Sequence, residues 1–239
     1  MASMSTIPSI SSTFGEPERL PLTLVDLANR FGEIPASRIC LDPPPGEATE
    51  QDLLEYSERD NRLFELVDGT LIEKTMGTFE SFIAIYIATA LQIYLQKHPI
   101  GLVLGVDGQL KLKPGTIRVP DVSFITRERA KNSDFLKTPI ASLSPNLAVE
   151  VISPSNSKRE MSDKLAEYFA TGSEEVWYVY PDQRELHQFS SPQKFIVLTE
   201  SDTLVSPQLL PGFSLPIASI FVDPLADEAP AASPSKKDG

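Results

Sequence analysis

Cysteine and histidine are scarce in this chain, and their scarcity excludes several kinds of site. Cys40 is the single cysteine among 239 residues, so a disulfide framework and a thiolate zinc site are excluded. His98 and His187 are the two histidines, which leaves little for a Ser-His-Asp triad or a histidine-rich metal centre. We therefore expect a cytoplasmic protein, because a reducing compartment suits a chain without disulfides.

Long apolar runs and a general excess of positive charge are also missing. No uninterrupted apolar run approaches about 18 residues, and the N-terminus lacks a basic region followed by an apolar core, so we expect neither export nor membrane insertion. The net charge of −12 argues against a surface that coats nucleic acid or an anionic membrane everywhere. Residues 111–164 nevertheless hold ten basic and six acidic side chains, a charge of +4, whereas the rest of the chain carries −16.

The chain is long enough for one well-buried domain with tails. Residues 1–20 are rich in Ser, Thr and Pro, and residues 223–239 in Ala, Pro, Ser, Asp and Lys. Both compositions bury too little apolar surface to offset the entropy of ordering, which predicts a mobile arm and a disordered tail. Between them we expect a helical extension over residues 21–48 and the main domain over residues 49–222.

Three capping patterns and one long apolar stripe predict the helices. The capping patterns are Thr23 with Asp26, Thr49 with Asp52, and Ser157 with Glu160. The stripe repeats every three or four residues from Thr78 to Lys97, which is typical of a long helix packed on a core.

Period-two patterns and turn residues predict the strands. Asp68-Gly69 suits a type I′ hairpin turn between strands 63–67 and 70–74. Three further strands are expected to form a meander, at 102–106, 109–113 and 117–125. The later strands are expected at 147–152, 176–180, 186–189 and 195–198. With the helices, these elements predict an α/β sandwich around a mixed sheet.

Residues 147–152 place one carboxylate inside an apolar strand. Pro145 and Pro154 bound the stretch, and its Val and Ile content favours a central strand that is buried on both faces. An unpaired buried carboxylate is destabilising by roughly several kcal/mol. Glu150 must therefore be neutral, or have a metal ion, a lysine or an arginine beside it.

Asp121 is a second acid within an apolar run, residues 119–125. If its strand is the neighbour of the Glu150 strand, both carboxylates converge at one end of the sheet, and hard oxygen ligands of this kind suit Mg²⁺ or Mn²⁺. The alternatives are a turn acid for Asp121 and a structural ion pair for Glu150, with Arg118 or Lys164 as its partner.

These motifs resemble a known group of nucleases. Pro120-Asp121 followed by Glu150-Val151-Ile152 looks like the PD-(D/E)XK signature of restriction-endonuclease-like enzymes. The order of motifs over about residues 53–221 resembles the Uma family of that superfamily. The motifs that add to this likeness are the hairpin 64–69, Glu150 to Ser155, Lys164 with Tyr168, Gly172, and the strand 176–179. The resemblance implies a restriction-endonuclease-like core, a mixed β-sheet flanked by helices, with extra N-terminal helices.

The resemblance also implies a function. The protein would be an endonuclease that hydrolyses DNA phosphodiester bonds with Mg²⁺, or with Mn²⁺ in its place, and would act as a homodimer without a membrane partner. Asp121 and Glu150 would hold the ion, with Glu80 of the long helix as a third ligand. For Glu80 the alternative is an ordinary acid in a first helical turn, where the helix dipole favours negative charge.

The sequence departs from the superfamily pattern at Ile152, where a lysine is expected two residues after the glutamate. We therefore predict that Lys164, on the following helix, supplies this charge, so that Asp121, Glu150 and Lys164 form the catalytic group. The alternative is a surface lysine whose stem covers a neighbour. Glu65 also interrupts an apolar strand, but we expect it on the wet face of a hairpin and leave it outside the site.

The basic residues around these acids are placed to contact a phosphate backbone. They are Lys111, Lys113, Arg118, Arg127, Arg129, Lys131, Lys137, Lys158 and Arg159. Two other functions stay open at this point. The chain could be a catalytically inactive nucleic-acid-binding module of the same fold, because isoleucine at position 152 cannot replace a lysine. It could also be an acidic protein-interaction domain in which Glu150 has a structural partner.

Overall fold

The computed structural model describes residues 22–60, 62–131, 134–223 and 225. The predicted arm and nearly all of the predicted tail lie outside the described residues. The α-helices are α1 (Leu24–Phe31), α2 (Glu50–Asp60), α3 (Thr78–Lys97), α4 (Arg127–Ala130), α5 (Lys158–Ala170) and α6 (Ile217–Ile220), with short 3₁₀ helices η1 (Ala36–Arg38) and η2 (Phe135–Lys137). The strands are β1 (Phe64–Val67), β2 (Thr70–Glu73), β3 (Gly101–Leu104), β4 (Leu110–Lys113), β5 (Thr116–Arg118), β6 (Val122–Thr126), β7 (Leu147–Val151), β8 (Glu175–Tyr180), β9 (Glu185–Ser191), β10 (Lys194–Leu198), β11 (Thr203–Ser206) and β12 (Leu210–Pro216).

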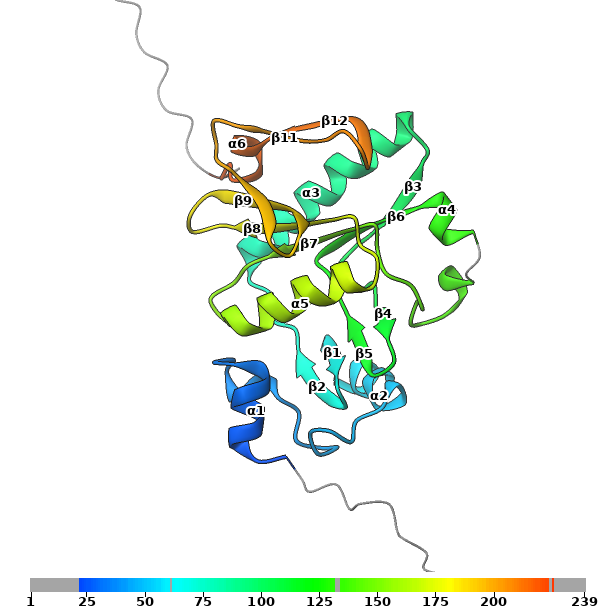
Figure 1. The fold of residues 1–239 in the computed structure, drawn as a ribbon, viewed down its shortest axis with the longest axis vertical. Coiled ribbons are helices and arrows are strands. Elements are labelled where there is room, and N and C mark those ends of the chain that lie inside the picture. The colour runs from blue at the N-terminus through cyan, green and yellow to red at the C-terminus, as the bar shows by residue number, and fades with distance from the viewer. Residues whose placement is uncertain (1–21, 61, 132–133, 224, 226–239) are drawn as a thin grey trace, which may run out of the picture.

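A six-stranded mixed sheet with the order β10-β9-β8-β7-β6-β3 is the centre of the fold (Figure 1). Strand β7 pairs parallel with β8 and antiparallel with β6, and every one of its residues is buried. The prediction of a central strand that carries Glu150 is therefore confirmed.

The two faces of this sheet are covered by different helices. On one face, α3, the hairpin β11-β12 and α6 pack against Leu147, Val149 and Val151. On the other face, α5 packs against Ala148 and its neighbours on β8. Because side chains alternate along a strand, Glu150 points to the α5 face.

Helix α3 has the bounds that its apolar stripe predicts. It is also long and apolar enough, by length and composition, to cross a membrane, although Thr89 and Gln92 interrupt its apolar sequence. Ile83, Ile87 and Leu91 are fully buried in the main core, so packing on the sheet accounts for the apolar character of this face.

A smaller sheet with the order β2-β1-β5-β4 lies below α5 in the view of Figure 1. The predicted meander is wrong, because β3 pairs with β6 in the large sheet while β4 and β5 join the hairpin β1-β2. The predicted strand 117–125 is divided at Pro120-Asp121. Proline has no N–H to donate, which interrupts a ladder, and here the chain passes from the small sheet to the large one.

The hairpin β1-β2 forms as predicted, with Val67 opposite Thr70. Asp68 and Gly69 have φ values of 48° and 73°, the positive values that a type I′ turn requires.

The N-terminal extension packs on α5 and on the hairpin. Leu27 and Phe31 of α1 contact Val67 and Ile72. The Arg38 guanidinium, from η1, forms two hydrogen bonds with the Glu160 carboxylate, of 2.7 and 3.0 Å, and both side chains are buried. The predicted capping box is half formed, because the backbone N–H of Glu160 donates to Ser157 Oγ while the Glu160 carboxylate binds Arg38.

Candidate active site

Asp121 and Glu150 lie side by side because β6 and β7 are neighbours. The backbone N–H of Asp121 donates to the Val149 carbonyl at 3.0 Å, and the backbone N–H of Val151 donates to Asp121 Oδ2 at 2.6 Å. Both acids are buried. The predicted convergence of the two carboxylates at one point is therefore present.

Lys74 lies between the two carboxylates, a position that the sequence did not suggest. Its Nζ is 2.9 Å from Asp121 Oδ1 and 3.0 Å from Glu150 Oε2, and it also donates to the Val119 carbonyl. The residue follows β2 directly, so the hairpin carries it from the small sheet to the large one. Its side chain is only 7% exposed.

Lys164 approaches Glu150 from α5. Its Nζ is 3.5 Å from Glu150 Oε1 and 3.0 Å from Glu65 Oε1, and its side chain is 2% exposed. One turn later, the Tyr168 hydroxyl donates to Glu150 Oε1 at 2.6 Å. The interpretation of Lys164 as an ordinary surface lysine is therefore wrong, and the helix places its charge next to the predicted acid.

Glu65 belongs to this group, so the expectation that it lies on the wet face of a hairpin is wrong. Its carboxylate accepts hydrogen bonds from Arg118 at 2.9 Å and from the backbone N–H of Val119 at 3.1 Å, and it pairs with Lys164. All four residues of β1 are buried, so this hairpin strand has no wet face. The signal in the sequence was an acid within the apolar run Phe64 to Val67.

Arg118 does not pair with Glu150. It binds Glu65 and, at 2.7 Å, Glu167 Oε2 of α5. The alternative of a structural pair between Arg118 and Glu150 is therefore wrong, and Arg118 is buried too deeply to contact a phosphate backbone.

The buried cluster carries one more negative charge than positive charge. Its acids are Glu65, Asp121, Glu150 and Glu167. Its cations are Lys74, Arg118 and Lys164, which are linked to these acids by ion pairs. Four carboxylates against three buried cations leave a charge of −1 when all groups are ionised, and the half-exposed Lys113, 3.6 Å from Glu167 Oε1, offsets it from the edge of the cluster.

Burial and neighbouring charge shift the pKa values within the cluster. Burial raises the pKa of Asp121, and the nearby Glu150 adds to this against the opposing effect of Lys74. Burial alone would raise the pKa of Glu65, but Lys164 and Arg118 outweigh it and hold that pKa well below its usual value. Burial and the neighbouring Glu150 raise the pKa of Tyr168, which keeps its hydroxyl protonated as a donor.

Glu80 does not join this group. It lies in the first turn of α3, and α3 packs on the opposite face of the large sheet from Glu150. Within the described parts of the chain, no cluster of three or more His, Cys, Asp or Glu side chains could hold a metal ion. The structure thus brings together Asp121, Glu150 and Lys164 from the predicted site, but not the predicted third ligand.

The residues at the centre nevertheless fit a hard divalent cation. Asp121 Oδ1, Glu150 Oε2 and the Val119 carbonyl oxygen all face the Lys74 ammonium. Asp121 Oδ1 is buried and accepts no hydrogen bond, so its negative charge is met only by the ion pair. An all-oxygen set with two carboxylates is what Mg²⁺ prefers, with water completing its coordination.

Comparison with known proteins identifies the family of the chain and relates its fold to that of a solved structure. A family model described as Uma2, putative restriction endonuclease, matches residues 50–218. The chain belongs to the Uma2 family. A crystal structure of a putative nuclease of the DUF820 family from Anabaena variabilis ATCC 29413 is similar to this chain, with a TM-score of 0.60 and 17% identity over 67% of this chain and 90% of that one. This likeness shows a shared nuclease-like fold, and family membership supports a nuclease. No match is found among curated proteins.

In this Uma2 protein, only part of the predicted basic surface is available to a ligand. Besides the buried Arg118, Arg129 donates to the Ser144 and Gly172 carbonyls, and Lys111 pairs with Glu50. The predicted basic side chains that stay exposed are Lys113, Arg127, Lys131, Lys137, Lys158 and Arg159.

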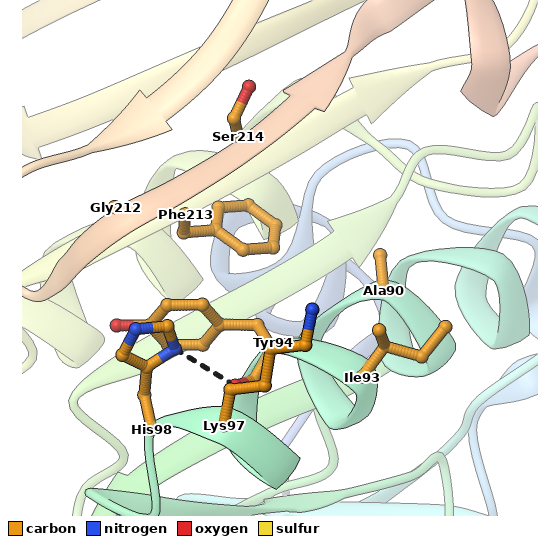
Figure 2. A pocket seen from close by; sticks show the side chains of 8 residues that line it. All are labelled: Ala90, Ile93, Tyr94, Lys97, His98, Gly212, Phe213 and Ser214. Atoms are coloured by element: carbon orange, nitrogen blue, oxygen red, sulfur yellow. Dashed lines mark hydrogen bonds between the residues drawn. The ribbon is translucent and has the colours of Figure 1, made fainter.

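The described part of the chain has several cavities outside the acidic cluster. Figure 2 shows one of about 390 Å³ between α3 and β12, lined by Tyr94, His98 and Phe213 among others. Ile152, at the position where the superfamily has its lysine, lines a second cavity of about 380 Å³ with Leu165 of α5 and Tyr178 of β8. The side chain at this position therefore faces the α5 side of the sheet, as Glu150 does.

Proposed function

We propose that this protein is a metal-dependent endonuclease that hydrolyses DNA phosphodiester bonds. The observation that carries the proposal is the meeting of Asp121 and Glu150 at one cation position, with Lys164 beside Glu150. Membership of the Uma2 family, whose description is that of a restriction endonuclease, supports DNA as the substrate.

Asp121 Oδ1, Glu150 Oε2 and the Val119 carbonyl would hold Mg²⁺, or Mn²⁺ in its place. A divalent ion supplies polarisation of a phosphoryl oxygen and a lower pKa for a bound water molecule. The protein's own residues orient the metal-binding carboxylate and supply a positive charge. Tyr168 orients the Glu150 carboxylate by donating to Oε1, and Lys164 provides a positive charge that stabilises negative charge developing on the phosphate.

Glu65 and Arg118 position Lys164 without contacting the substrate in this scheme. Glu65 Oε1 lies 3.0 Å from Lys164 Nζ, and Arg118 holds Glu65 Oε2 at 2.9 Å. The chain of charges from Arg118 through Glu65 to Lys164 fixes the ammonium on the Glu150 side of α5. This arrangement replaces the strand lysine that Ile152 removes.

The second candidate is a nucleic-acid-binding module of the same fold without turnover. Ile152 in the lysine position and Lys74 between the acids favour it. Both candidates predict DNA binding that weakens as salt rises, because the exposed lysines and arginines would displace counterions from the phosphates.

Nicking of a supercoiled plasmid separates the two candidates. The full chain is incubated with DNA and either Mg²⁺, Mn²⁺ or EDTA, and Asp121→Asn and Glu150→Gln are compared with Asp107→Asn, which changes an exposed acid. The endonuclease requires metal-dependent nicking that both site variants abolish and that the control retains. Salt-sensitive binding without nicking by the wild-type protein would favour the inactive module instead.

The predicted homodimer would present two such sites to the two strands of a duplex. Sedimentation velocity of the full chain, with and without DNA, tests it. A particle that contains one chain, both without DNA and when bound to it, would contradict the dimer. This result would not bear on single-strand nicking.

A further inference from the structure

Lys74 occupies the position that the proposed metal ion would need. Its Nζ contacts Asp121 Oδ1 at 2.9 Å, Glu150 Oε2 at 3.0 Å and the Val119 carbonyl. We propose that Lys74 is an internal counter-ion that competes with the divalent ion for this position and leaves it when the ion binds. This inference rests on the metal-dependent function proposed above.

Distance argues that the two cations exclude each other. Mg²⁺ binds carboxylate oxygens at about 2.1 Å. An ion at this distance from both Asp121 Oδ1 and Glu150 Oε2 would lie against the ammonium, which already contacts the same two oxygens. Two positive charges at such close range in a buried site repel each other strongly, so one of them must leave.

Charge balance favours the exchange of one cation for the other. With Lys74 in place, four buried carboxylates face three buried cations and the half-exposed Lys113, which lies 3.6 Å from Glu167, so the charges balance. Replacing the ammonium by a divalent ion would leave one extra positive charge, whereas adding the ion beside the ammonium would leave two. Exchange therefore disturbs the charge balance less than addition does.

The side chain of Lys74 can leave without unfolding its surroundings. Its backbone N–H donates to the Leu63 carbonyl at 2.8 Å, which fixes the main chain at the end of the hairpin. The next residue, Thr75, is exposed, so solvent lies close to the flexible four-carbon stem. Lys164, by contrast, comes from the middle of α5 and is held by Glu65 as well as Glu150.

Mn²⁺ binding by variants of the full chain tests the competition. Loss of the electron paramagnetic resonance signal of free Mn²⁺ reports binding without requiring turnover. Lys74→Met removes the ammonium and keeps most of the stem, and Lys97→Met removes an equal charge from an exposed position in the last turn of α3. Lys74→Met is expected to bind Mn²⁺ at least about tenfold more tightly than the wild-type protein, and Lys97→Met as the wild-type protein does.

Two outcomes would overturn the inference. One is an affinity of Lys74→Met no higher than that of the wild-type protein. The other is a gain that persists in Lys74→Met combined with Asp121→Asn, since the ion would then bind elsewhere. If the wild-type protein binds Mn²⁺ through Asp121 and Glu150 but Lys74→Met gains nothing, the inference fails and the proposed function stands. If neither protein binds Mn²⁺, the metal-dependent function fails as well.

Amine labelling of the wild-type protein gives a second test that does not depend on the folding of a variant. A lysine-reactive reagent followed by peptide mass spectrometry measures the labelling rate of each lysine with and without saturating Mg²⁺. Lys74 is expected to label at least several times faster when Mg²⁺ is present, while Lys164 stays protected. An unchanged rate at Lys74, under conditions where Mn²⁺ is shown to bind, would overturn the displacement.

Discussion

Glu150 shows how one buried carboxylate organises its neighbours. Its Oε1 accepts from Tyr168 and lies near Lys164, and its Oε2 faces Lys74, so each oxygen has a partner from a different element. A buried charge that loses its partners is strongly destabilising, which explains why three side chains, two from α5 and one from the end of the hairpin, converge on this glutamate.

The pKa of Glu65 makes stability depend on pH. Its folded-state pKa lies below the ordinary value of 4.5, so the unfolded chain binds more protons in acid. Its contribution to stability is complete above pH 4.5 and is lost as the pH falls below this value towards the lower folded-state pKa. Glu65→Gln should lessen the slope of unfolding free energy against pH below 4.5 by up to about 1.4 kcal/mol per pH unit.

Urea denaturation of wild-type protein and Glu65→Gln at a series of acidic pH values measures this slope. The variant should also be less stable at neutral pH, because Lys164 and Arg118 lose a shared partner. Equal slopes for the two proteins would show that Glu65 has the same pKa in the folded and unfolded states.

Lys164 should affect turnover more than affinity. Lys164→Met is expected to reduce the rate constant for plasmid nicking by roughly 10²- to 10⁴-fold, the usual range for a lost proton-transfer or charge-stabilising group, with DNA affinity little changed. Lys97→Met, at an exposed position in the last turn of α3, is the control and should keep the rate constant. Nicking by Lys164→Met at the wild-type rate would contradict its catalytic role.

At the scale of elements, α5 and the hairpin β1-β2 assemble the site. Helix α5 spaces Lys164 and Tyr168 four residues apart, so both side chains lie on one face and reach the same glutamate. The hairpin supplies Glu65 from β1 and Lys74 from just after β2, on opposite sides of one turn. The geometry of this turn therefore decides where two charges of the site lie.

Gly69 should be the most sensitive position of the hairpin turn. Its φ of +73° disfavours any side chain, and a Cβ there would lie 2.5 Å from the Gly46 carbonyl oxygen. Gly69→Ala is expected to lower the free energy of unfolding by more than about 2 kcal/mol. Gly115→Ala has a similar φ of +74° with nothing within 4 Å of the added Cβ, and should lose only about 1 to 2 kcal/mol.

Chemical denaturation measures the free energy of unfolding of the two alanine variants. Because both glycines have a similar positive φ, the difference between the two losses reports the clash with Gly46 rather than backbone strain. Equal losses for Gly69→Ala and Gly115→Ala would mean that the segment around Gly46 moves aside. In that case the extension would not constrain the hairpin.

At the scale of the whole molecule, the N-terminal extension is tied to the domain through α5. Arg38 links η1 to Glu160 by a buried pair and also donates to the Glu73 and Ser155 carbonyls, each at 2.8 Å. One guanidinium thus joins the extension to the end of β2 and to the segment before α5. Lys74 directly follows β2, and Lys164 lies on the helix that comes after the second segment.

Removing Arg38 should therefore destabilise the whole domain. Arg38→Ala leaves the buried Glu160 carboxylate without its main partner and should lower the free energy of unfolding by about 3 to 5 kcal/mol. Arg30→Ala removes partly exposed pairs with Asp68 and Asp163 and should lose no more than about 1 kcal/mol. Urea denaturation measures both values, and a small loss for Arg38→Ala would show that Glu160 reaches water.

Much of the fold could be predicted from local patterns, and the failures have one physical cause. The stripe of α3, the turn at Asp68-Gly69 and the apolar run of β7 each depend on residues close in sequence. The meander failed because β3 pairs with β6 across the intervening β4 and β5. Strand pairing between distant segments leaves no periodic signal in either strand.

The residues of the candidate site also fall into those that local patterns predict and those that only the packing of distant elements reveals. Asp121 and Glu150 could be found because an acid within an apolar strand conflicts with its surroundings, and Lys164 because Ile152 required a replacement. Glu65 was missed because both faces of its hairpin are covered, which depends on the packing of distant elements. Magnesium dependence, the homodimer and the cytoplasmic location stay predictions.

The sequence by itself determined the four longer helices, the hairpin turn, the buried acids and the family, because each depends on local spacing and residue chemistry. Only the tertiary structure decided which charges meet. It placed Lys74 between Asp121 and Glu150, paired Arg118 with Glu65 and Glu167, and positioned Glu80 on the other side of the large sheet. The reason is that ion pairs form between side chains brought together by strand order and helix packing, and neither is encoded in the neighbouring residues of any one charge.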